Sequence, residues 1–333
     1  MTSEALAALR GLVGVVRAWP GRRGAVVLER RGDDGLLRAG RVGADGRVEL
    51  ADYAADPRLP ELVPPPDGAL VVHRLHRRAV VLRADRAVKL LRPGRTRPLV
   101  AASRRLGGPC EGTGLRVARV LAATDARVEL SLLAGRSLHE LGDDGLDGWA
   151  RLAEAWPRIA ARPDLADSGH TGADEVAVLA RWLAAAGEHG ALGRLDALRR
   201  AVERVCAELV ASADPPALLH RDLHDGQLLW DGRELGVLDL DTVARGEAAL
   251  DVGNLLAHAE LGRLTGALGA PAHRRVRGHL AELAARTGAR PARVDCYRRA
   301  ARLRLALVHA FRPAADWWLP EWVEACLASA EPP

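Results

Sequence analysis

The stretch "LLHRDLHDGQLLWDGRELGVLDLDT", residues 218–242, most constrains the fold, because it places two short strands inside an otherwise helical half of the chain. Its strand-like segments "LLW" and "ELGVLDL" are joined by an Asp-Gly pair, which is typical of a tight β-hairpin turn. The hairpin would bring Gln227, just before its first strand, near Asp239, at the end of its second. Asp222 lies five residues before Gln227, on the loop that leads in. Two carboxylates and an amide oxygen predict a site for Mg²⁺, which prefers hard oxygen ligands.

Strand-like and helical patterns occupy different parts of the chain. From Gly24 to about Leu91, short β-like runs alternate with turn signals such as "GDDG" and "GADG". After Gly135 the pattern becomes helical, and residues 193–212 carry an amphipathic apolar stripe. Further expected elements are a helix over 3–18 with Ser3 as its N-cap, a helix near 97–106, and strands over 115–121 and 126–133.

This order predicts an α+β fold, with strands first and helices after. The 333 residues suffice for two domains or for one large unit of two lobes. We expect a β-rich N-lobe over residues 1–133, including an accessory N-terminal segment, and a mainly helical C-lobe over residues 134–333.

Lys89 is the only lysine among the 48 lysine and arginine residues of the chain. Arginine is a planar fork and lysine a compact point charge, so the two are not equivalent where one small cation has to fit a confined space. A single lysine could remain either because it has a specific role or by chance. Other motifs of the sequence are needed to distinguish these two explanations.

Composition argues against several other classes of protein. The net charge of +5 is spread along the chain and aromatic residues make up only 3%, so we expect no nucleic-acid partner. Arg17 interrupts the short N-terminal apolar run "GLVGVV", so we expect neither a signal peptide nor a membrane span. The cysteines are far apart and lack metal-ligand spacing, which predicts reduced thiols in a cytoplasmic protein; they are Cys110, Cys206, Cys296 and Cys326.

The motifs "HRDLHDGQ" and "VLDLD" resemble the catalytic and metal-binding motifs of kinases, and most closely those of the aminoglycoside phosphotransferase and choline-kinase-like family of small-molecule kinases. That resemblance implies a protein-kinase-like bilobal fold, with nucleotide bound by the N-lobe. It implies that Asp222 is the catalytic base and that Gln227 and Asp239 hold Mg²⁺. Lys89 would bind the α- and β-phosphates of the nucleotide. Supporting positions around the site are His224, Asp241 and Asp251, the last as a brace for the catalytic loop.

Three features depart from the pattern of that family. Gln227 stands where the family usually has Asn, and it offers the same carbonyl oxygen on a stem one methylene longer. The segment 95–108 contains no acid that could pair with Lys89, which would then be held by Asp239 or by the nucleotide alone. The turn "RLHRR" at residues 74–78 is not rich in glycine, and its arginines are either solvated or in contact with phosphate.

We therefore expect an enzyme that moves the γ-phosphate of ATP or GTP to a hydroxyl of a small molecule, such as an aminoglycoside, another antibiotic or a sugar. A pseudokinase-like nucleotide-binding module is one alternative. A metallohydrolase is another, because alternate residues of "HRDLH" would face one side of a strand; its ligands would be His220, Asp222, His224, Asp239 and His258. The sequence does not indicate an oligomeric state.

Other residues of the motif region receive structural roles. We expect His220 to pack and hydrogen-bond, and Arg221 to form a salt bridge with Asp251. Three tryptophans at helical spacing near the C-terminus are expected in the core rather than on a substrate wall; they are Trp317, Trp318 and Trp322.

Overall fold

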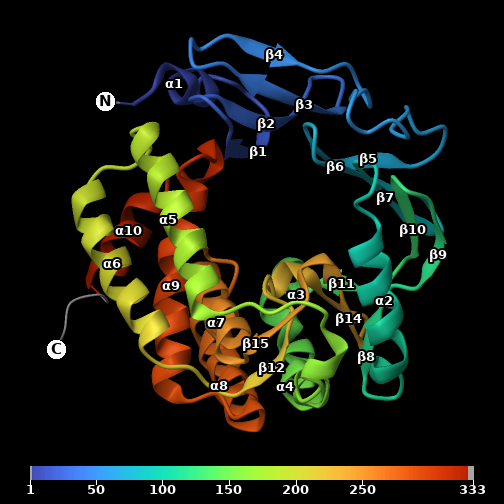
Figure 1. Ribbon diagram of the computed structural model, residues 1–333, viewed down its shortest axis with the longest axis vertical. Coiled ribbons are helices and arrows are strands. Elements are labelled where there is room, and N and C mark those ends of the chain that lie inside the picture. Colours follow the sequence, from blue (N-terminus) through green and yellow to red (C-terminus); the bar gives the residue numbers. More distant parts are fainter. Residues whose placement is uncertain (1, 329–333) are drawn as a thin grey trace.

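The computed structural model describes residues 2–328, and Figure 1 shows that most strands lie across the top and right of the molecule, while most long helices lie in the lower part with a few short strands among them. The N-terminal sheet lies across the top of the view, a second sheet lies to the right, and the helices fill the lower part. This arrangement confirms the α+β class. The division of the chain between residues 133 and 134 stays a prediction.

The N-terminal unit is a short helix followed by an antiparallel sheet in the order β1-β2-β3-β4. The Ser3 hydroxyl accepts the backbone N–H of Leu6, so the expected N-cap is present. The expected helix over 3–18 is wrong beyond Arg10, because two glycines and a run of β-branched valines favour extended chain over helix. The elements are α1 (Glu4–Arg10), β1 (Val15–Pro20), β2 (Val26–Arg31), β3 (Leu37–Val42) and β4 (Val48–Leu50).

The second sheet is antiparallel throughout and has the order β5-β6-β7-β10-β9. Lys89 lies on its central strand, opposite Val80 on one neighbour and Val128 on the other. The expected strand over 115–121 is split, and its first part, β8 (Leu115–Val117), pairs with another sheet. The remaining elements are β5 (Ala69–Arg74), β6 (Arg78–Leu82), β7 (Arg86–Leu91), α2 (Arg97–Cys110), β9 (Val120–Ala123) and β10 (Arg127–Ser131).

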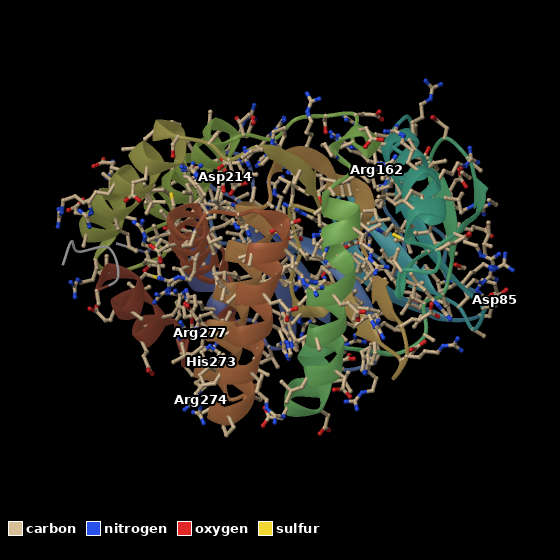
Figure 2. All side chains as sticks on the ribbon, turned by 90° about the horizontal axis from the view of Figure 1, so that it is seen from below. Asp85, Arg162, Asp214, His273, Arg274 and Arg277 are labelled. Carbon is tan, nitrogen blue, oxygen red and sulfur yellow. The ribbon has the colours of Figure 1, made fainter. Side chains whose placement is uncertain are left out.

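The helical half packs α7 against α9 and α4 against α8. Helix α8 shows why such segments are helical: Val276 and Leu280 are buried on one face, while Arg274 and Arg277 project from the other (Figure 2). The helices are α3 (Leu138–Leu141), α4 (Leu146–Ala160), α5 (Gly172–Glu188), α6 (Leu195–Ala211), α7 (Ala249–Thr265), α8 (Ala270–Thr287), α9 (Pro291–His309) and α10 (Leu319–Ala328).

The expected hairpin interrupts these helices and is confirmed. Its strands β13 (Leu228–Trp230) and β14 (Leu235–Val237) are antiparallel, with Leu228 opposite Val237. Strand β14 also pairs in parallel with β8, so the hairpin is joined to the chain that follows α2. Two further pairings involve β11 (Arg136–Ser137), which lies beside β13, and β12 (Pro216–Leu219), which lies beside β15 (Ala244–Glu247).

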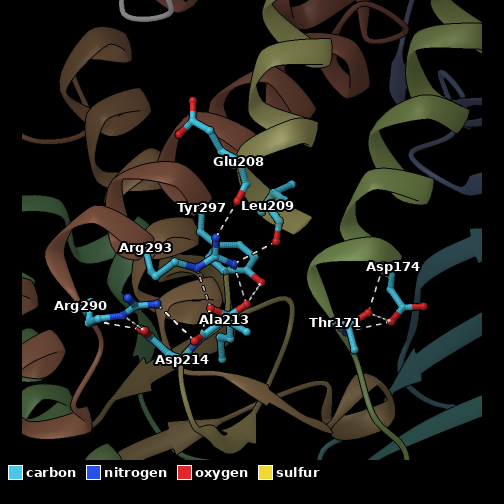
Figure 3. Close-up of polar contacts among 10 residues, drawn as sticks. Thr171, Asp174, Glu208, Leu209, Ala213, Asp214, Arg290, Arg293 and Tyr297 are labelled. Carbon is cyan, nitrogen blue, oxygen red and sulfur yellow. Dashed lines mark hydrogen bonds and ion pairs between the residues drawn. The ribbon is translucent and has the colours of Figure 1, made fainter. Parts of the chain in front are cut away.

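A buried ion pair joins β15 to the helices. Glu247 accepts two hydrogen bonds from the Arg293 guanidinium, each of 2.7 Å, and a third of 2.8 Å from the Tyr297 hydroxyl. Arg293 also donates to the carbonyl oxygens of Glu208 and Leu209 at the end of α6, as Figure 3 shows. One arginine therefore connects β15, α6 and α9, and every charge involved has a partner.

The structure of residues 2–328 also tests the expectations about the cysteines, the C-terminal tryptophans and a membrane span. The four cysteines form no disulfide with one another, and three of them are buried. Trp318 and Trp322 are buried as expected, whereas Trp317 is 70% exposed. No helix in this part of the chain combines the length and the apolar character needed to cross a membrane.

Replacing Arg293 by Met should destabilise the protein strongly, because Glu247 would stay buried without its charged partner. We expect the free energy of unfolding in urea to fall by about 3–5 kcal/mol, and the double change Glu247→Gln with Arg293→Met to recover part of that loss. The exposed Arg286 offers a control, in which the same change to Met should cost less than about 1 kcal/mol. Equal effects at the two arginines would contradict the role given to the buried pair.

Candidate active site

The loop that carries Asp222 is held in place by a carboxylate beneath it. Asp251, in the first turn of α7, is 2% exposed, and its two oxygens accept the backbone N–H groups of His220 and Arg221, each at 2.8 Å. These bonds hold Arg221 at a φ of 72°, a left-handed conformation that is unfavourable for a residue with a side chain. The next residue, Asp222, is thereby turned toward solvent and is exposed.

Three further hydrogen bonds fix the same loop. The ring of His220 lies with Nε2 2.6 Å from the carbonyl oxygen of Leu238, and the Thr242 hydroxyl donates to the carbonyl oxygen of His220. Asn254, one turn after Asp251 on α7, donates to the carbonyl oxygen of Leu223. The loop is therefore tied both to α7 and to the chain that follows the hairpin.

The hairpin brings Gln227 and Asp239 together. The backbone N–H of Leu238 donates to the carbonyl oxygen of Gln227, and the Gln227 side-chain amide lies 3.3 Å from Oδ2 of Asp239. Asp239 directly follows the hairpin with a φ of 53°, which is again the left-handed region. A strained backbone at an acidic residue that faces a cleft is typical of a functional position.

Lys89 reaches this pair from the second sheet. Its Nζ donates to Oδ1 of Asp239 and, at 3.1 Å, to Oδ1 of Asp241. Only 11% of the Lys89 side chain is exposed. The carboxylates that pair with Lys89 thus come from the segment after the hairpin and not from α2, which contains no acid.

These contacts shift the titration of the groups involved. Burial alone would lower the pKa of Lys89, but the charges of Asp239 and Asp241 outweigh burial and raise that pKa above its usual value. Burial alone would raise the pKa of Asp239, but the charge and hydrogen bond of Lys89, together with the charge of Arg78 and the hydrogen bond of Gln227, outweigh burial and hold that pKa below its usual range. Lys89 and Asp239 therefore both stay charged at neutral pH, and the Lys89 ammonium lies between the carboxylates of Asp239 and Asp241.

The side chains at this point fit a magnesium ion. Asp239 and Gln227 offer carboxylate and amide oxygens from adjacent positions, and Asp241 adds a second carboxylate, which is the oxygen-rich donor set that Mg²⁺ takes. The amide of Gln227 presents its nitrogen to Asp239, so a half-turn of the amide group would aim its oxygen at an ion bound there.

A cavity of about 380 Å³ opens beside these groups, between the second sheet and the hairpin. Lys89 and Asp239 lie in its wall, and most of the remaining wall is apolar. Residues from the sheet include Val72, Val80 and Ala87, and residues from the hairpin include Leu229 and Val237. Larger cavities lie elsewhere, but they hold neither Lys89 nor Asp239. An apolar slot with a charged end suits a flat ring that carries a charged tail.

Residues 62–279 match the phosphotransferase enzyme family, known as APH. The chain belongs to this family. The resemblance seen in the motifs is therefore confirmed. None of the curated proteins matches the sequence.

Solved structures show that this phosphotransferase has the protein-kinase-like fold. It is similar to a choline/ethanolamine kinase family protein from Mesorhizobium loti, with a TM-score of 0.55, 18% identity, and coverage of 80% of this chain and 89% of that one. It is also similar to a thermostable mutant of aminoglycoside phosphotransferase APH(4)-Ia, with a TM-score of 0.57, 14% identity, and coverage of 80% and 96%. A third is a mutant aminoglycoside 2'-phosphotransferase in complex with GDP, with a TM-score of 0.51, 16% identity, and coverage of 79% and 90%. The expected bilobal fold class is confirmed.

The alternative metallohydrolase ligands do not come together. His220 is fully buried against Leu238, because "HRDLH" forms a loop and not a strand. Within residues 2–328, the one His, Cys and carboxylate group close enough for a metal is His224, Asp225 and His258. The two imidazole rings stack at 4.5 Å with planes only 12° apart, so their in-plane lone pairs cannot converge on one ion.

Two other expectations need correction or completion. The salt bridge expected between Arg221 and Asp251 is wrong: Asp251 binds the backbone N–H of Arg221, while the guanidinium of Arg221 donates to the carbonyl oxygen of Thr242. The turn at 74–78 is held by Asp56, which accepts the backbone N–H of His76 at 2.6 Å. Arg78 at its end lies 3.7 Å from Asp241.

Two residues near the site, Asn254 and Arg17, were missed from the sequence. Asn254 supports the catalytic loop, and its spacing of three residues from Asp251 on one helix is a signal that could have revealed it. Arg17 lines the cavity although it belongs to the N-terminal sheet. Nothing local in the sequence indicates that placement.

Lys89→Arg should impair turnover although arginine serves almost everywhere else in this chain. The larger guanidinium has to fit between two carboxylates in a space that is 11% exposed, so we expect a loss of at least ~10-fold in kcat/KM, about 1.4 kcal/mol. Arg86→Lys, on the same strand, is the matched control and should be neutral. Steady-state kinetics of the two variants decide the matter, and wild-type rates in Lys89→Arg would show that the lysine is an accident of composition.

Asp251→Asn should loosen the loop that carries Asp222. In the variant, the amide nitrogen of the new side chain would face one of the two backbone N–H groups, so that hydrogen bond would be lost and two donors would face each other. We expect the free energy of unfolding to fall by about 1–3 kcal/mol. We also expect kcat to fall more than KM for the nucleotide. The same change at the exposed Asp147 is the control, and urea unfolding with kinetics on both variants provides the test.

Proposed function

We propose that this phosphotransferase moves the γ-phosphate of ATP or GTP to a hydroxyl group of a small molecule. The observation that carries the proposal is the convergence of Lys89, Asp239 and Gln227 at the charged end of an apolar cavity, next to a loop that exposes Asp222. The cavity is compatible with a nucleotide base in its apolar part and phosphates at its charged end. The GDP complex of one similar enzyme supports a purine nucleotide as donor.

Asp222 is proposed as the catalytic base. Its carboxylate would orient the acceptor hydroxyl and take its proton as the hydroxyl oxygen forms the new bond to the γ-phosphorus and the bond to the β–γ bridging oxygen breaks. Asp222 is exposed, so an acceptor can reach it from solvent. The bonds from Asp251 to the preceding two residues hold the carboxylate in one direction, which favours a reactive geometry.

Lys89 is proposed to bind phosphate oxygens of the nucleotide. Its ammonium group donates one hydrogen bond to Asp239 and one to Asp241, and a triphosphate in the cavity would compete with these carboxylates for the N–H donors. Asp239 and Gln227 would then hold Mg²⁺, which supplies charge neutralisation at the phosphates when bound. Asp241 would remain a neighbour of both Lys89 and Arg78 and so keep the lysine in place.

The acceptor is proposed to be a small polar molecule with a free hydroxyl. Similar structures include enzymes named for aminoglycosides and for choline or ethanolamine, all of which are hydroxyl compounds. Aminoglycosides, other antibiotics and sugars are therefore the first compounds to screen, with transfer of labelled γ-phosphate from ATP and from GTP as the readout.

Asp222→Ala should abolish phosphate transfer and keep nucleotide binding, because the residue acts on the acceptor hydroxyl. Asp239→Asn should abolish transfer by weakening the Mg²⁺ site, and saturating Mg²⁺ should not restore it. We expect losses of at least ~100-fold in kcat for both. The exposed Asp144→Asn is the control. Transfer by Asp222→Ala at a near-normal rate would contradict the assignment of the base, and wild-type protein that binds nucleotide but phosphorylates no hydroxyl compound would favour the pseudokinase alternative.

A further inference from the structure

Arginines from three separate segments lie around strand β1, and one of them lines the cavity that holds Lys89. Arg17 is on β1 and lines the same cavity as Lys89. Arg74 ends β5, and its guanidinium lies 4.5 Å from the ring centroid of Trp19, also on β1. Arg312 follows α9 and immediately precedes η5 (Pro313–Ala315), the short turn that packs against β1. Strand β1 thus joins the three positions.

Only one carboxylate is shared among these arginines. Glu29, on β2 opposite Arg17, is fully buried, and its Oε2 accepts a 2.6 Å bond from Nε of Arg17. Its other oxygen accepts the backbone N–H of His73. Among residues 2–328, no carboxylate lies within ion-pair distance of Arg74 or Arg312. The positive charge at this place therefore exceeds the negative charge.

Arg312 shows the imbalance most clearly. Its Nε is buried and has no hydrogen-bond partner within residues 2–328. One of its terminal nitrogens lies 3.4 Å from Nε2 of His309, and burial, followed by the charge of Arg312, lowers the pKa of His309 to about 3, so this neighbour is neutral. Burial and the charge of Arg17 also lower the pKa of Arg312 itself.

The same imbalance is present at Arg74. Burial, and then the charges of Arg77 and Arg78, lower the pKa of Arg74 to about 10. Burying guanidinium groups beside one another is unfavourable unless an anion compensates them. Glu29 and Asp222 are the acidic groups whose charges act on Arg312, and Glu29 is already engaged by Arg17.

We propose that Arg17, Arg74 and Arg312 form a binding site for a phosphate-like oxyanion at the edge of the cleft. The planar fork of arginine matches the oxygens of a phosphate and can bind two of them at once. Arg17 places this site at the wall of the cavity that holds Lys89, and β1 joins Arg74 and the segment after Arg312 to that wall. This inference rests on the proposed function, because the reaction places phosphate at that point.

Two sources can supply such an oxyanion, the γ-phosphate of the nucleotide and an acid group on the acceptor. In the first case the arginines would serve in place of the backbone amides of a glycine-rich loop, which the turn at 74–78 does not provide. In the second case the acceptor would carry a phosphate or a carboxylate, and a polycationic acceptor would be disfavoured by repulsion.

The test measures the binding of MgATP, MgADP and inorganic phosphate to the full chain by calorimetry. Arg312→Gln is the main variant, because no carboxylate loses its partner, and Arg74→Gln is the second. We expect Arg312→Gln to weaken MgATP by at least ~10-fold and MgADP by less than ~3-fold, because only the triphosphate extends to the cluster. Inorganic phosphate should bind to the MgADP-saturated protein and weaken by a similar factor in the variant.

The control is Arg83→Gln, at the start of the β6–β7 turn, where Arg83 pairs with the exposed Asp67. A different result would identify the acceptor as the source of the oxyanion. In that case Arg312→Gln would leave the preference for ATP over ADP unchanged, but it would weaken the binding of inorganic phosphate to protein saturated with a non-hydrolysable ATP analogue. Unchanged affinities in both cluster variants, or equal losses in the control, would overturn the site.

If circular dichroism shows that Arg312→Gln does not fold, Arg74→Gln decides by the same measurements. The binding readouts need no turnover, so failure of the site and failure of the proposed function can be told apart. If the protein binds phosphate through these arginines but transfers none, the proposed function is contradicted and the oxyanion site is supported. If the protein is active but the arginine variants have unchanged affinities, the proposed function is supported and the oxyanion site is contradicted.

Discussion

The arrangement of the active site depends on a buried carboxylate that accepts two backbone N–H groups. Asp251 can do this because an ionised carboxylate is purely an acceptor, and its two oxygens match the two consecutive donors of His220 and Arg221. The same bonds offset the strain of a left-handed Arg221. Burial raises the pKa of Asp251, although the charge of His220 and the two hydrogen bonds act in the opposite direction. The geometry of Asp222 is thus set from beneath the loop.

Helix α7 can serve as that support because it packs very closely on α9. A Cβ atom at Gly253 would lie 2.6 Å from the backbone nitrogen of Arg298, so only glycine allows the two helices this approach. Asn254, the next residue, accepts a hydrogen bond from Arg304 of α9 and donates one to the catalytic loop. Packing in the helical half and geometry at the loop are therefore coupled through the contacts that Gly253 and Asn254 make with α9.

The N-terminal unit connects the two sides of the cleft. At one end, Ser3 donates its backbone N–H to the carbonyl oxygen of His189 in the helical half. At the other end, Arg17 donates to the carbonyl oxygen of Val71 in the second sheet. The unit thereby brings the charge of Arg17 to the cavity, in addition to the charges of Lys89 and Asp239, which come from the two sides of the cleft itself. The N-terminal segment, which the sequence suggests is only an accessory to the N-lobe, therefore forms part of the cleft wall in the folded protein.

The sequence by itself determined the features that arise from local pattern: the hairpin at 228–237, the α+β order, and the short distance from Gln227 to Asp239. It also indicated Lys89 through composition, although the roles of these residues stay predictions. Local pattern predicted the wrong structure at residues 11–18, where glycines and valines favour extended chain over the expected helix. It also predicted the wrong contact at Arg221, whose backbone N–H, and not its guanidinium, binds Asp251. Only the tertiary structure decided which carboxylates face Lys89, that Arg17 reaches the cavity, and that within residues 2–328 neither Arg74 nor Arg312 has a carboxylate at ion-pair distance. The physical reason is that these contacts join residues far apart in the chain, such as Lys89 and Asp241 at a separation of 152 positions, and charges so distant in the chain meet only through the packing of whole elements.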